Sequence, residues 1–362
     1  MMMAEATNHY FKHLGVSDGL SQVCIPSIYQ DELGAVWLGT TEGLNRYNGK
    51  DVKVFQPSES NHGLTNNEIN ELCGDKNGRM YIRSGNDLIK LDIYTEQFTC
   101  LRQKGVYGLF CKKDTLWVSC ADGIYYYTGQ GTELTFFARV QKGFVGRALY
   151  VDKETVWVVT RKYLVAISRE DPLRQEILLT LDKGNCILGD SSGNIWVGAW
   201  NGLYRVSPDR ETTAYVSHSG MGELSDNQVR CVLEDDFKHI WVGTFKGIDC
   251  YDPATDTWSH YTRYGSSSNS LSHTSILALH KDMHLFFLLT FCADNSDGKR
   301  HIQFYLLEIQ IHNAWQWSLP PFRNLVRNVH HAGLPGSKVH GASLLPVPEA
   351  PRSSVFLHLQ GC

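Results

Sequence analysis

The chain has 362 residues, of which 42% are hydrophobic and 11% aromatic, so it can bury a large core and is not a disordered polymer. Lysine and arginine total 34 against 38 aspartate and glutamate residues, which gives a formal net charge of −4. This balance creates no general attraction to nucleic acid or to an anionic membrane, so we expect neither as a partner.

No targeting or membrane-spanning segment is visible in the sequence. The longest apolar run, 285–293, is far shorter than the ~20 residues that a membrane-spanning helix requires. The N-terminus lacks a basic stretch followed by an apolar one, so we expect no signal peptide, which favours the cytoplasm if the start is genuine. The ten cysteines include no Cys-x-x-Cys pair. We interpret them as free thiols and expect no metal and no cofactor.

An internal repeat of about forty residues is the strongest pattern in the chain. Segments 34–40, 193–199 and 238–244 each place a tryptophan between apolar residues and follow it with glycine, and segments 78–84, 114–120 and 154–160 are weaker copies. The spacing between successive aromatic anchors is 36 to 45 residues. These anchors, which we expect to pack between blades, are Trp37, Tyr81, Trp117, Trp157, Trp196 and Trp241.

Each copy predicts four short β-strands. In the last full copy the expected strands are 229–234, 239–244, 248–251 and 258–263, separated by polar turns and by Pro253, which cannot donate to a strand ladder. In the turns 75–78 and 190–193 we expect the aspartate to bind backbone amides and the glycine to adopt a positive φ. Four strands per forty residues are typical of an all-β fold, the β-propeller.

We predict seven blades, of which six are clear and the seventh is incomplete or divergent. The N-terminal strand 9–14 resembles the fourth strand of the last full copy, and such a strand would complete the seventh blade and close the ring. The expected organisation is a disordered N-terminus at 1–8, a propeller at 9–282, a divergent remainder of blade seven at 283–317, and an irregular, disordered tail at 318–362.

The repeat pattern stops after residue 282. The last 80 residues hold 6 of the 11 prolines but 4 of the 38 acidic residues, and seven of the 15 histidines gather there without the spacing of metal ligands. Two explanations stay open. Either the native continuation was lost by a frameshift, rearrangement or gene-model error, or the seventh blade is divergent, with 285–291 and 301–311 as replacement strands, and is followed by a tail.

Residues 224–252 have the form Leu-Ser-x-Asn-x-Val-x-x-Val-Leu-Glu-Asp-x-x-x-x-Ile-Trp-Val-Gly-Thr-x-x-Gly-Ile-x-x-Tyr-Asp. The first copy matches through 19–21 and 37–47. This repeat resembles the two-component-regulator propeller repeat, and the resemblance covers roughly residues 9–282. It is similar to the first periplasmic sensor propeller of the hybrid two-component histidine kinases of glycan-degrading gut bacteria.

The resemblance implies a periplasmic, non-catalytic sensor module that responds to oligosaccharides. Members of the family continue into a second propeller, an immunoglobulin-like domain, a membrane helix, a histidine kinase, a receiver and a DNA-binding region. Kinase activity would belong to those domains, which this chain lacks. The implied partners are an oligosaccharide ligand, the other domains of the parent receptor and a homodimer partner.

Six turns between second and third strands are expected to converge on one face of the propeller. They combine arginines, amides and aromatic rings, which suit a sugar because its rings stack on aromatic faces and its hydroxyls need polar partners. We therefore predict that Arg83, Arg161, Trp200 and Phe245 contribute to a ligand-binding surface. The competing interpretation is that these are ordinary solvated turn residues.

Catalysis is not expected, and no catalytic residue is assigned. The six turns offer two carboxylates, Glu42 and Asp122, two blades apart, whereas paired glycosidase carboxylates lie roughly 5 Å apart. The sequence has neither a Gly-x-Ser-x-Gly motif nor a phosphate-binding loop of the Walker type. The alternatives are a free-standing protein-interaction scaffold, a truncated non-functional fragment and a propeller polysaccharide lyase.

Overall fold

The computed structural model describes residues 10–12, 14–57, 63–217, 224–262, 275–281, 286–291 and 304–308. All of them belong to one compact unit, Met1–Ile309. The expectations for residues 1–8 and 318–362, and for most of 283–317, lie outside the described residues. No helix of the described part is long and apolar enough to cross a bilayer.

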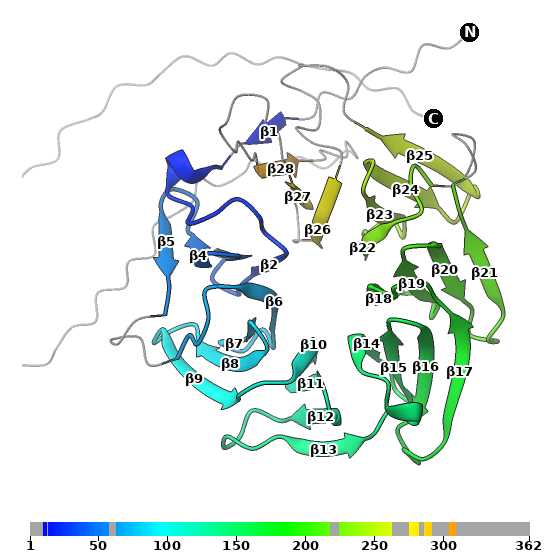
Figure 1. Cartoon of the computed structure of the whole chain (residues 1–362). Helices are drawn as coiled ribbons and strands as arrows, with labels where there is room; N and C mark the ends of the chain where they lie inside the picture. Colours follow the sequence, from blue (N-terminus) through cyan, green and yellow to red (C-terminus); the bar gives the residue numbers. More distant parts are fainter. Residues whose placement is uncertain are drawn as a thin grey trace, which may run out of the picture. The chain divides into compact units, whose positions relative to one another are not determined.

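Six sheets of four antiparallel strands form the blades of a β-propeller, as the repeat predicts (Figure 1). Each blade takes four consecutive strands, with its first strand innermost. Blades 1 to 3 are β2 (Ser27–Gln30), β3 (Val36–Thr40), β4 (Gly43–Tyr47) and β5 (Val52–Phe55); β6 (Ile69–Gly74), β7 (Arg79–Ser84), β8 (Asp87–Asp92) and β9 (Gln97–Arg102); and β10 (Val106–Lys112), β11 (Thr115–Cys120), β12 (Gly123–Tyr127) and β13 (Thr135–Ala138). Blades 4 to 6 are β14 (Gly146–Val151), β15 (Thr155–Thr160), β16 (Tyr163–Ser168) and β17 (Gln175–Thr180); β18 (Cys186–Gly189), β19 (Ile195–Ala199), β20 (Gly202–Val206) and β21 (Thr212–Tyr215); and β22 (Val229–Glu234), β23 (Ile240–Thr244), β24 (Ile248–Asp252) and β25 (Thr257–Tyr261). Helical structure in the described residues is limited to two 3-10 turns, η1 (Val16–Asp18) and η2 (Gln141–Gly143).

A further four-stranded sheet contains β26 (Ser275–Lys281), β27 (Phe286–Phe291), β28 (Phe304–Glu308) and β1 (Tyr10–Lys12). Its strands pair antiparallel in the order β26, β27, β28 and β1, so the N-terminal strand lies at the outer edge. The inner strand β26 contacts β22 of blade 6 and β2 of blade 1. Whether this sheet is a closing seventh blade stays a proposal.

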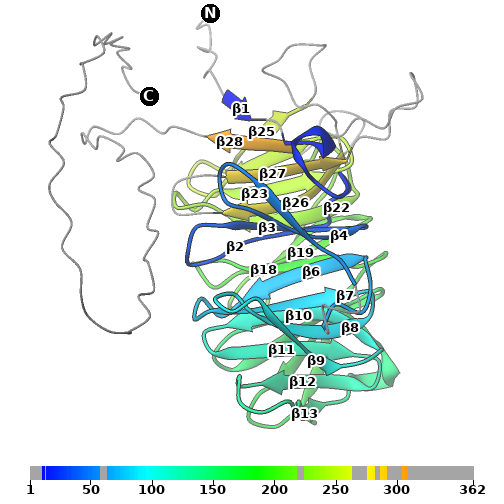
Figure 2. The ribbon, with the colours of Figure 1, turned by 90° about the vertical axis from the view of Figure 1, so that its left-hand side faces the viewer.

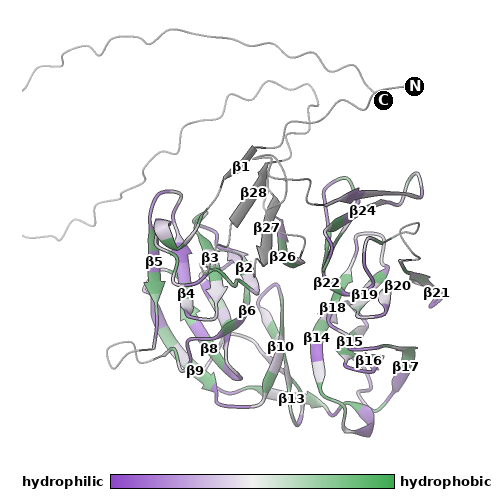
Figure 3. Ribbon diagram, turned by 45° about the horizontal axis from the view of Figure 1, so that its top comes forward, coloured by the Kyte–Doolittle hydropathy of each residue, from purple (hydrophilic) through white to green (hydrophobic). Residues whose placement is uncertain are grey.

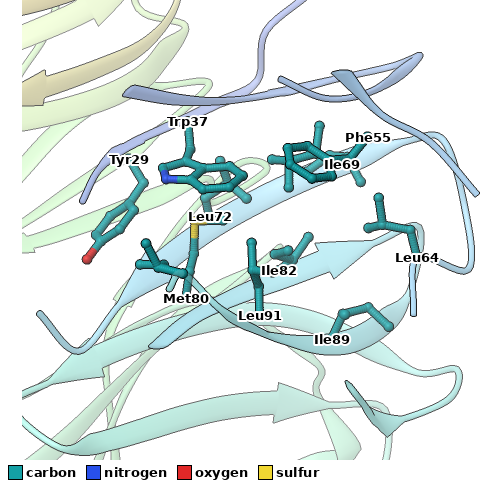
Figure 4. Close-up of a cluster of buried hydrophobic side chains, with 12 residues drawn as sticks. Tyr29, Trp37, Phe55, Leu64, Ile69, Leu72, Met80, Ile82, Ile89 and Leu91 are labelled. Atoms are coloured by element: carbon teal, nitrogen blue, oxygen red, sulfur yellow. The ribbon is translucent and has the colours of Figure 1, made fainter. Parts of the chain in front are cut away.

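The six aromatic anchors are buried between blades, as expected from their place in apolar strands. Trp37 and Tyr81 are fully buried, and the exposed fraction of the others does not exceed 8%. Neighbouring blades form successive layers (Figure 2), and hydrophobic stretches run along their strands (Figure 3). Between blades 1 and 2 the indole of Trp37 packs with Ile69, Leu72 and Met80 (Figure 4). Burying these faces supplies the main stabilisation of the ring.

An aspartate at the end of the first strand fixes both the following turn and the tryptophan. In blade 5, Asp190 Oδ1 accepts from the amides of Ser192 and Asn194 at 2.9 and 2.8 Å, and Gly193 has a φ of 86°. These contacts confirm the turn predicted at 190–193. The second oxygen, Oδ2, accepts from Trp196 Nε1 at 2.8 Å. The same carboxylate-to-indole bond joins residues 31 and 37, 152 and 157, and 235 and 241, at 2.7 to 2.9 Å.

A second polar motif links the segment that precedes the first strand of a blade to the third strand of the same blade by hydrogen bonds. In blade 1, Asn45 Oδ1 accepts from the Ser21 amide at 2.8 Å, and Asn45 Nδ2 donates to Ser21 Oγ at 2.8 Å. In blade 6 the corresponding residue is Asp249, whose Oδ2 accepts from the Ser225 amide and hydroxyl at 3.0 Å. Asp249 also contacts His260 Nδ1 at 2.8 Å. Burial raises the pKa of Asp249 despite these bonds.

Replacing Trp37 by Phe should destabilise the protein more than replacing Trp117 by Phe. Both tryptophans occupy the anchor position and are buried, but Trp37 donates to Asp31 at 2.7 Å, whereas no carboxylate partner of the Trp117 indole is found among the described residues. Losing the indole donor also leaves the buried Asp31 carboxylate short of a partner, which costs about 1.5 to 3 kcal/mol. Urea unfolding of both variants measures the difference, and equal losses would contradict it.

Replacing Asp249 by Asn should remove a pH-dependent loss of stability. Because burial raises the pKa of Asp249 in the folded state, its stabilising contribution is complete below the unfolded pKa of about 3.9 and is lost as pH rises through the folded pKa. The variant copies the Asn45 arrangement of blade 1. Its stability relative to the parent should therefore increase from acidic to neutral pH.

Chemical denaturation across that pH range tests the Asp249 prediction. Asp209→Asn, the same change of charge at an exposed residue, is the matched control. If the difference in stability between D249N and the parent stays constant with pH, ionisation of Asp249 does not destabilise the folded state, and the prediction is wrong.

Candidate functional site

The inner strands of the blades surround a central cavity of about 390 Å³. All six blades and β26 contribute residues to its lining. This volume lies in the range of small-molecule sites, and sites of that kind combine a mostly preformed scaffold with a few polar groups. The cavity is therefore the candidate ligand site of the described part of the chain.

β-Bulges place one residue from each of four blades, and one from β26, in the lining of this cavity. The register of the first and second strands shifts in β6, β10, β14 and β22 at the second residue of the inner strand, and in β26 at the third. A bulge leaves this residue outside the regular ladder and re-aims its side chain. Together with the corresponding residues of blades 1 and 5, these residues form what we term the mouth ring: Pro26, Asn70, Tyr107, Arg147, Asn185, Arg230 and Leu277.

The mouth ring lies beside the turns that join second to third strands. In blade 4, Gly146 pairs with Thr160, so Arg147 lies next to the turn that contains Arg161. In blade 6, Val229 pairs with Thr244, which places Arg230 beside Phe245. The turns predicted to carry the ligand surface and the cavity opening therefore lie on the same face.

The two predicted arginines occupy different places on this face. Arg83 lines the cavity, and its Nε lies 3.3 Å from Glu71 Oε2. Arg161 is exposed in the β15–β16 turn, outside the described lining. It is nevertheless close enough to Arg147 for its charge to act on that residue. Of the two predicted arginines, Arg83 thus lies in the cavity wall and Arg161 does not, and a ligand contact by either stays a prediction.

The two predicted aromatic residues lie together. The rings of Trp200 and Phe245 meet edge to face, with centroids 6.3 Å apart. Lys183 Nζ lies 3.6 Å from the centroid of Trp200, and the Arg230 guanidinium lies 4.8 Å from the centroid of Phe245. One face of each ring therefore carries a cation, so a sugar cannot stack on that face of Trp200 without displacing Lys183.

Arg147, Arg230 and Lys183 are the residues that sequence reasoning missed. A signal for the first two was present. In every copy of the repeat, the mouth-ring residue precedes the position of the repeat aspartate by five residues. Arg147 thus precedes Asp152, and Arg230 precedes Asp235. Lys183 has no such signal, because it lies in a loop between blades.

Burial and neighbouring charges shape the electrostatics of the mouth. Burial raises the pKa of Glu71, and the charge of Arg83 opposes this shift. Partial burial, together with the positive charges of Arg161 and Arg83, lowers the pKa of Arg147. Arg147 therefore lies in a positive field that the described carboxylates do not balance.

The arrangement offers hydrogen-bond donors and positive charge rather than an acid–base pair. Of the two carboxylates in the turns, Asp122 is bound by Arg102 at 2.7 Å and by the Tyr125 hydroxyl at 2.8 Å, and its pKa is lowered. Glu42 lies on another blade. Within the described ranges, no group of three or more His, Cys, Asp or Glu side chains could hold a metal ion.

Sequence comparison connects the chain to two-component regulators. Residues 223–246 match the two-component regulator propeller family. A histidine kinase from Formosa agariphila is 38% identical over 55 residues, which are 15% of this chain and 4% of that protein. The repeat predicted from the sequence is therefore present, and this chain matches a small part of the relative's length.

Solved structures with the same fold include extracellular domains of two hybrid two-component systems from B. thetaiotaomicron. The first has 20% identity, a TM-score of 0.68 and coverage of 82% of this chain and 42% of that one. The second has 19% identity, a TM-score of 0.65 and coverage of 82% and 39%. The streptogramin B lyase structure also matches, with 14% identity, a TM-score of 0.60 and coverage of 78% and 95%.

At such identities the structural similarity establishes the propeller fold alone. The chain spans less than half of the length of the two extracellular domains. The chain thus shares its repeat with the two-component regulator propeller family and its fold with extracellular domains of hybrid two-component systems.

Proposed function

We propose that the chain is a non-catalytic sensor propeller that binds an oligosaccharide at the mouth ring. The observation that carries the proposal is the convergence of side chains from every blade on one cavity opening, in a fold that two-component sensor domains share. Arginine and asparagine side chains there can donate to sugar hydroxyls, and Tyr107, which is 38% exposed, offers a ring face.

The same proposal places the propeller outside the cytoplasm, in the periplasm, as the input part of a larger receptor. The two structural relatives are extracellular domains, and each is more than twice as long as the part that matches this chain. A membrane helix and a kinase would belong to the remainder of such a receptor. Ligand binding would act by favouring one arrangement of the propeller relative to its neighbouring domains and its homodimer partner.

The proposal includes a seventh blade made of β26, β27, β28 and β1. Support comes from the antiparallel pairing of these strands and from the contacts of β26 with blades 1 and 6. Pairing of β1 with β28 joins the two ends of the propeller sequence, and a closed ring leaves no open blade edge for aggregation.

A panel of defined oligosaccharides, titrated into the full chain by calorimetry, tests the function. We expect at least one to bind. Trp200→Ala should weaken this binding about tenfold, because it removes the ring that supports Lys183 and contacts Phe245. Phe245→Ala should act similarly through Arg230. Phe237→Ala is the matched control, since Phe237 is 51% exposed in the turn at the opposite end of β23.

The outcomes separate the competing functions. Equal weakening by F237A and W200A would remove the mouth from the proposal. Binding of a protein instead of any saccharide would favour an interaction scaffold. New ultraviolet absorbance on incubation with uronic-acid polysaccharides would establish a lyase and contradict the non-catalytic assignment.

A further inference from the structure

Positive charge exceeds negative charge in the wall of the cavity. The described lining contains three arginines, Arg83, Arg147 and Arg230, and one carboxylate, Glu71. Arg83 and Glu71 face each other at 3.3 Å and offset one another. Two guanidinium groups, those of Arg147 and Arg230, remain without an acidic counterpart in the described lining.

Arg147 shows the imbalance most clearly. It is an exposed bulge residue of the mouth ring, and none of the described carboxylates forms an ion pair with it. Its charged neighbours are Arg161 and Arg83, which repel it. A cation kept beside like charges costs free energy in the empty site, and a bound anion would relieve this cost.

The remaining cations are held on aromatic rings, which position a charge without neutralising it. Arg230 lies over Phe245 and Lys183 over Trp200, and these two rings contact each other. The two aromatic residues thus form one platform that carries two cations from neighbouring blades. Such a platform fixes the positions of both cations and leaves their charges available to a ligand, because neither charge is neutralised by an ion pair with the rings.

Carboxylates do occur elsewhere on the same face, and several are already paired. Asp122 is bound by Arg102, and Asp226 lies 3.3 Å from Lys246 Nζ. Glu68 is exposed, and its charge acts together with that of Arg230 on the Cys24 thiol. Within the described lining of the cavity itself, the arginines outnumber the carboxylates by three to one.

We propose that the ligand is an anionic oligosaccharide, whose carboxylate or sulfate groups bind Arg147 and the cation platform of Arg230 and Lys183. The inference rests on the proposed function and narrows its ligand class. Both anionic groups accept two parallel, charge-assisted hydrogen bonds from a guanidinium, whereas the hydroxyl oxygens of a neutral sugar carry no charge. Arg83 contributes less, because Glu71 already occupies it.

Calorimetry with three probes tests the ligand class: a trigalacturonate, a sulfated galactose oligosaccharide and neutral galactotriose. We expect one of the charged probes to bind the full chain at least ten times more tightly than the neutral one. The affinity should fall as salt is raised, because part of it is electrostatic. The two charged probes distinguish carboxylate from sulfate.

Arg147→Gln should weaken binding of the charged probe about ten- to a hundredfold, because the variant lacks one charged hydrogen-bonding group. Arg147→Lys should recover part of this loss, because it restores the charge without the paired geometry. Arg174→Gln, which removes the same charge from an exposed position in the β16–β17 hairpin of the same blade, should leave binding unchanged. Arg230→Gln provides an independent variant if R147Q alters the thermal midpoint.

The results keep the two proposals apart. Galactotriose bound as tightly as the charged probes, with R147Q unaffected, would overturn the anionic class and leave the oligosaccharide sensor intact. Equal weakening by R147Q and R174Q would reduce the effect to net charge and would also overturn the specific site. Absence of binding by every saccharide of the panel and by these three probes would overturn both proposals.

Discussion

The bond between the repeat aspartate and the indole of the anchor tryptophan is the interaction on which four of the six blades depend. A carboxylate removed from water needs hydrogen-bond partners, and the half-buried Asp190 finds them in two turn amides, the Asn194 side chain and Trp196 Nε1. One residue thereby fixes the first hairpin, the pairing of the two inner strands and the orientation of the ring that packs between blades. Because the mouth residue stands five positions earlier on the same strand, this bond also sets where Asn185 enters the mouth ring.

Blades 2 and 3 depart from this arrangement and show what can replace it. In blade 2 the anchor is Tyr81, and Asp75 instead binds the Arg79 guanidinium. The Tyr81 hydroxyl is buried without a partner among the described residues, but its ring packs edge to face with Tyr127 at 6.0 Å. In blade 3, Trp117 is held by aromatic neighbours, Tyr126 at 5.5 Å and Phe137 at 5.1 Å. Aromatic packing therefore maintains the anchor where the carboxylate is absent or engaged elsewhere.

Much of the fold follows from local patterns that repeat. The alternation around Val232 predicts an inner strand, and the structure places β22 at Val229–Glu234 as expected. The turn residues Asp190 and Gly193 act as predicted, but the second bond of the aspartate, to Trp196, could not be foreseen. That bond joins residues six apart across a hairpin, and its existence depends on how the two strands pair. Beyond the repeat, strands at 285–291 and 301–311 are expected under one of the two open explanations, and the structure has β27 at Phe286–Phe291 and β28 at Phe304–Glu308.

The site was harder to predict than the fold because its chemistry arises from departures from regular pairing. The turn residues Trp200 and Phe245 stood out by type, but the lysine over Trp200 comes from a preceding loop, and no spacing rule connects the two. Arg147 lies within β14, the first strand of its repeat copy. The alternation of apolar and polar residues there gives no sign that Arg147 leaves the regular strand pairing. The bulge at Gly146–Ala148 removes it from the ladder, and this shift appears only when β14 and β15 are paired.

The repeat itself separates the residues that build the propeller from those that line its cavity and are proposed to contact a ligand. Residues that pack or pair are similar from blade to blade. In five of the seven sheets, for example, the residue directly before the mouth-ring residue is valine or isoleucine. The mouth-ring position does not: it carries Pro, Asn, Tyr, Arg, Asn, Arg and Leu around the ring, and five of these seven residues lie at bulges. A bulge residue is free of ladder partners and of the inter-blade core, so its identity can change at little cost to stability. The same feature that frees this position from the demands of folding exposes it to the cavity, and for that reason we place the proposed ligand contacts there.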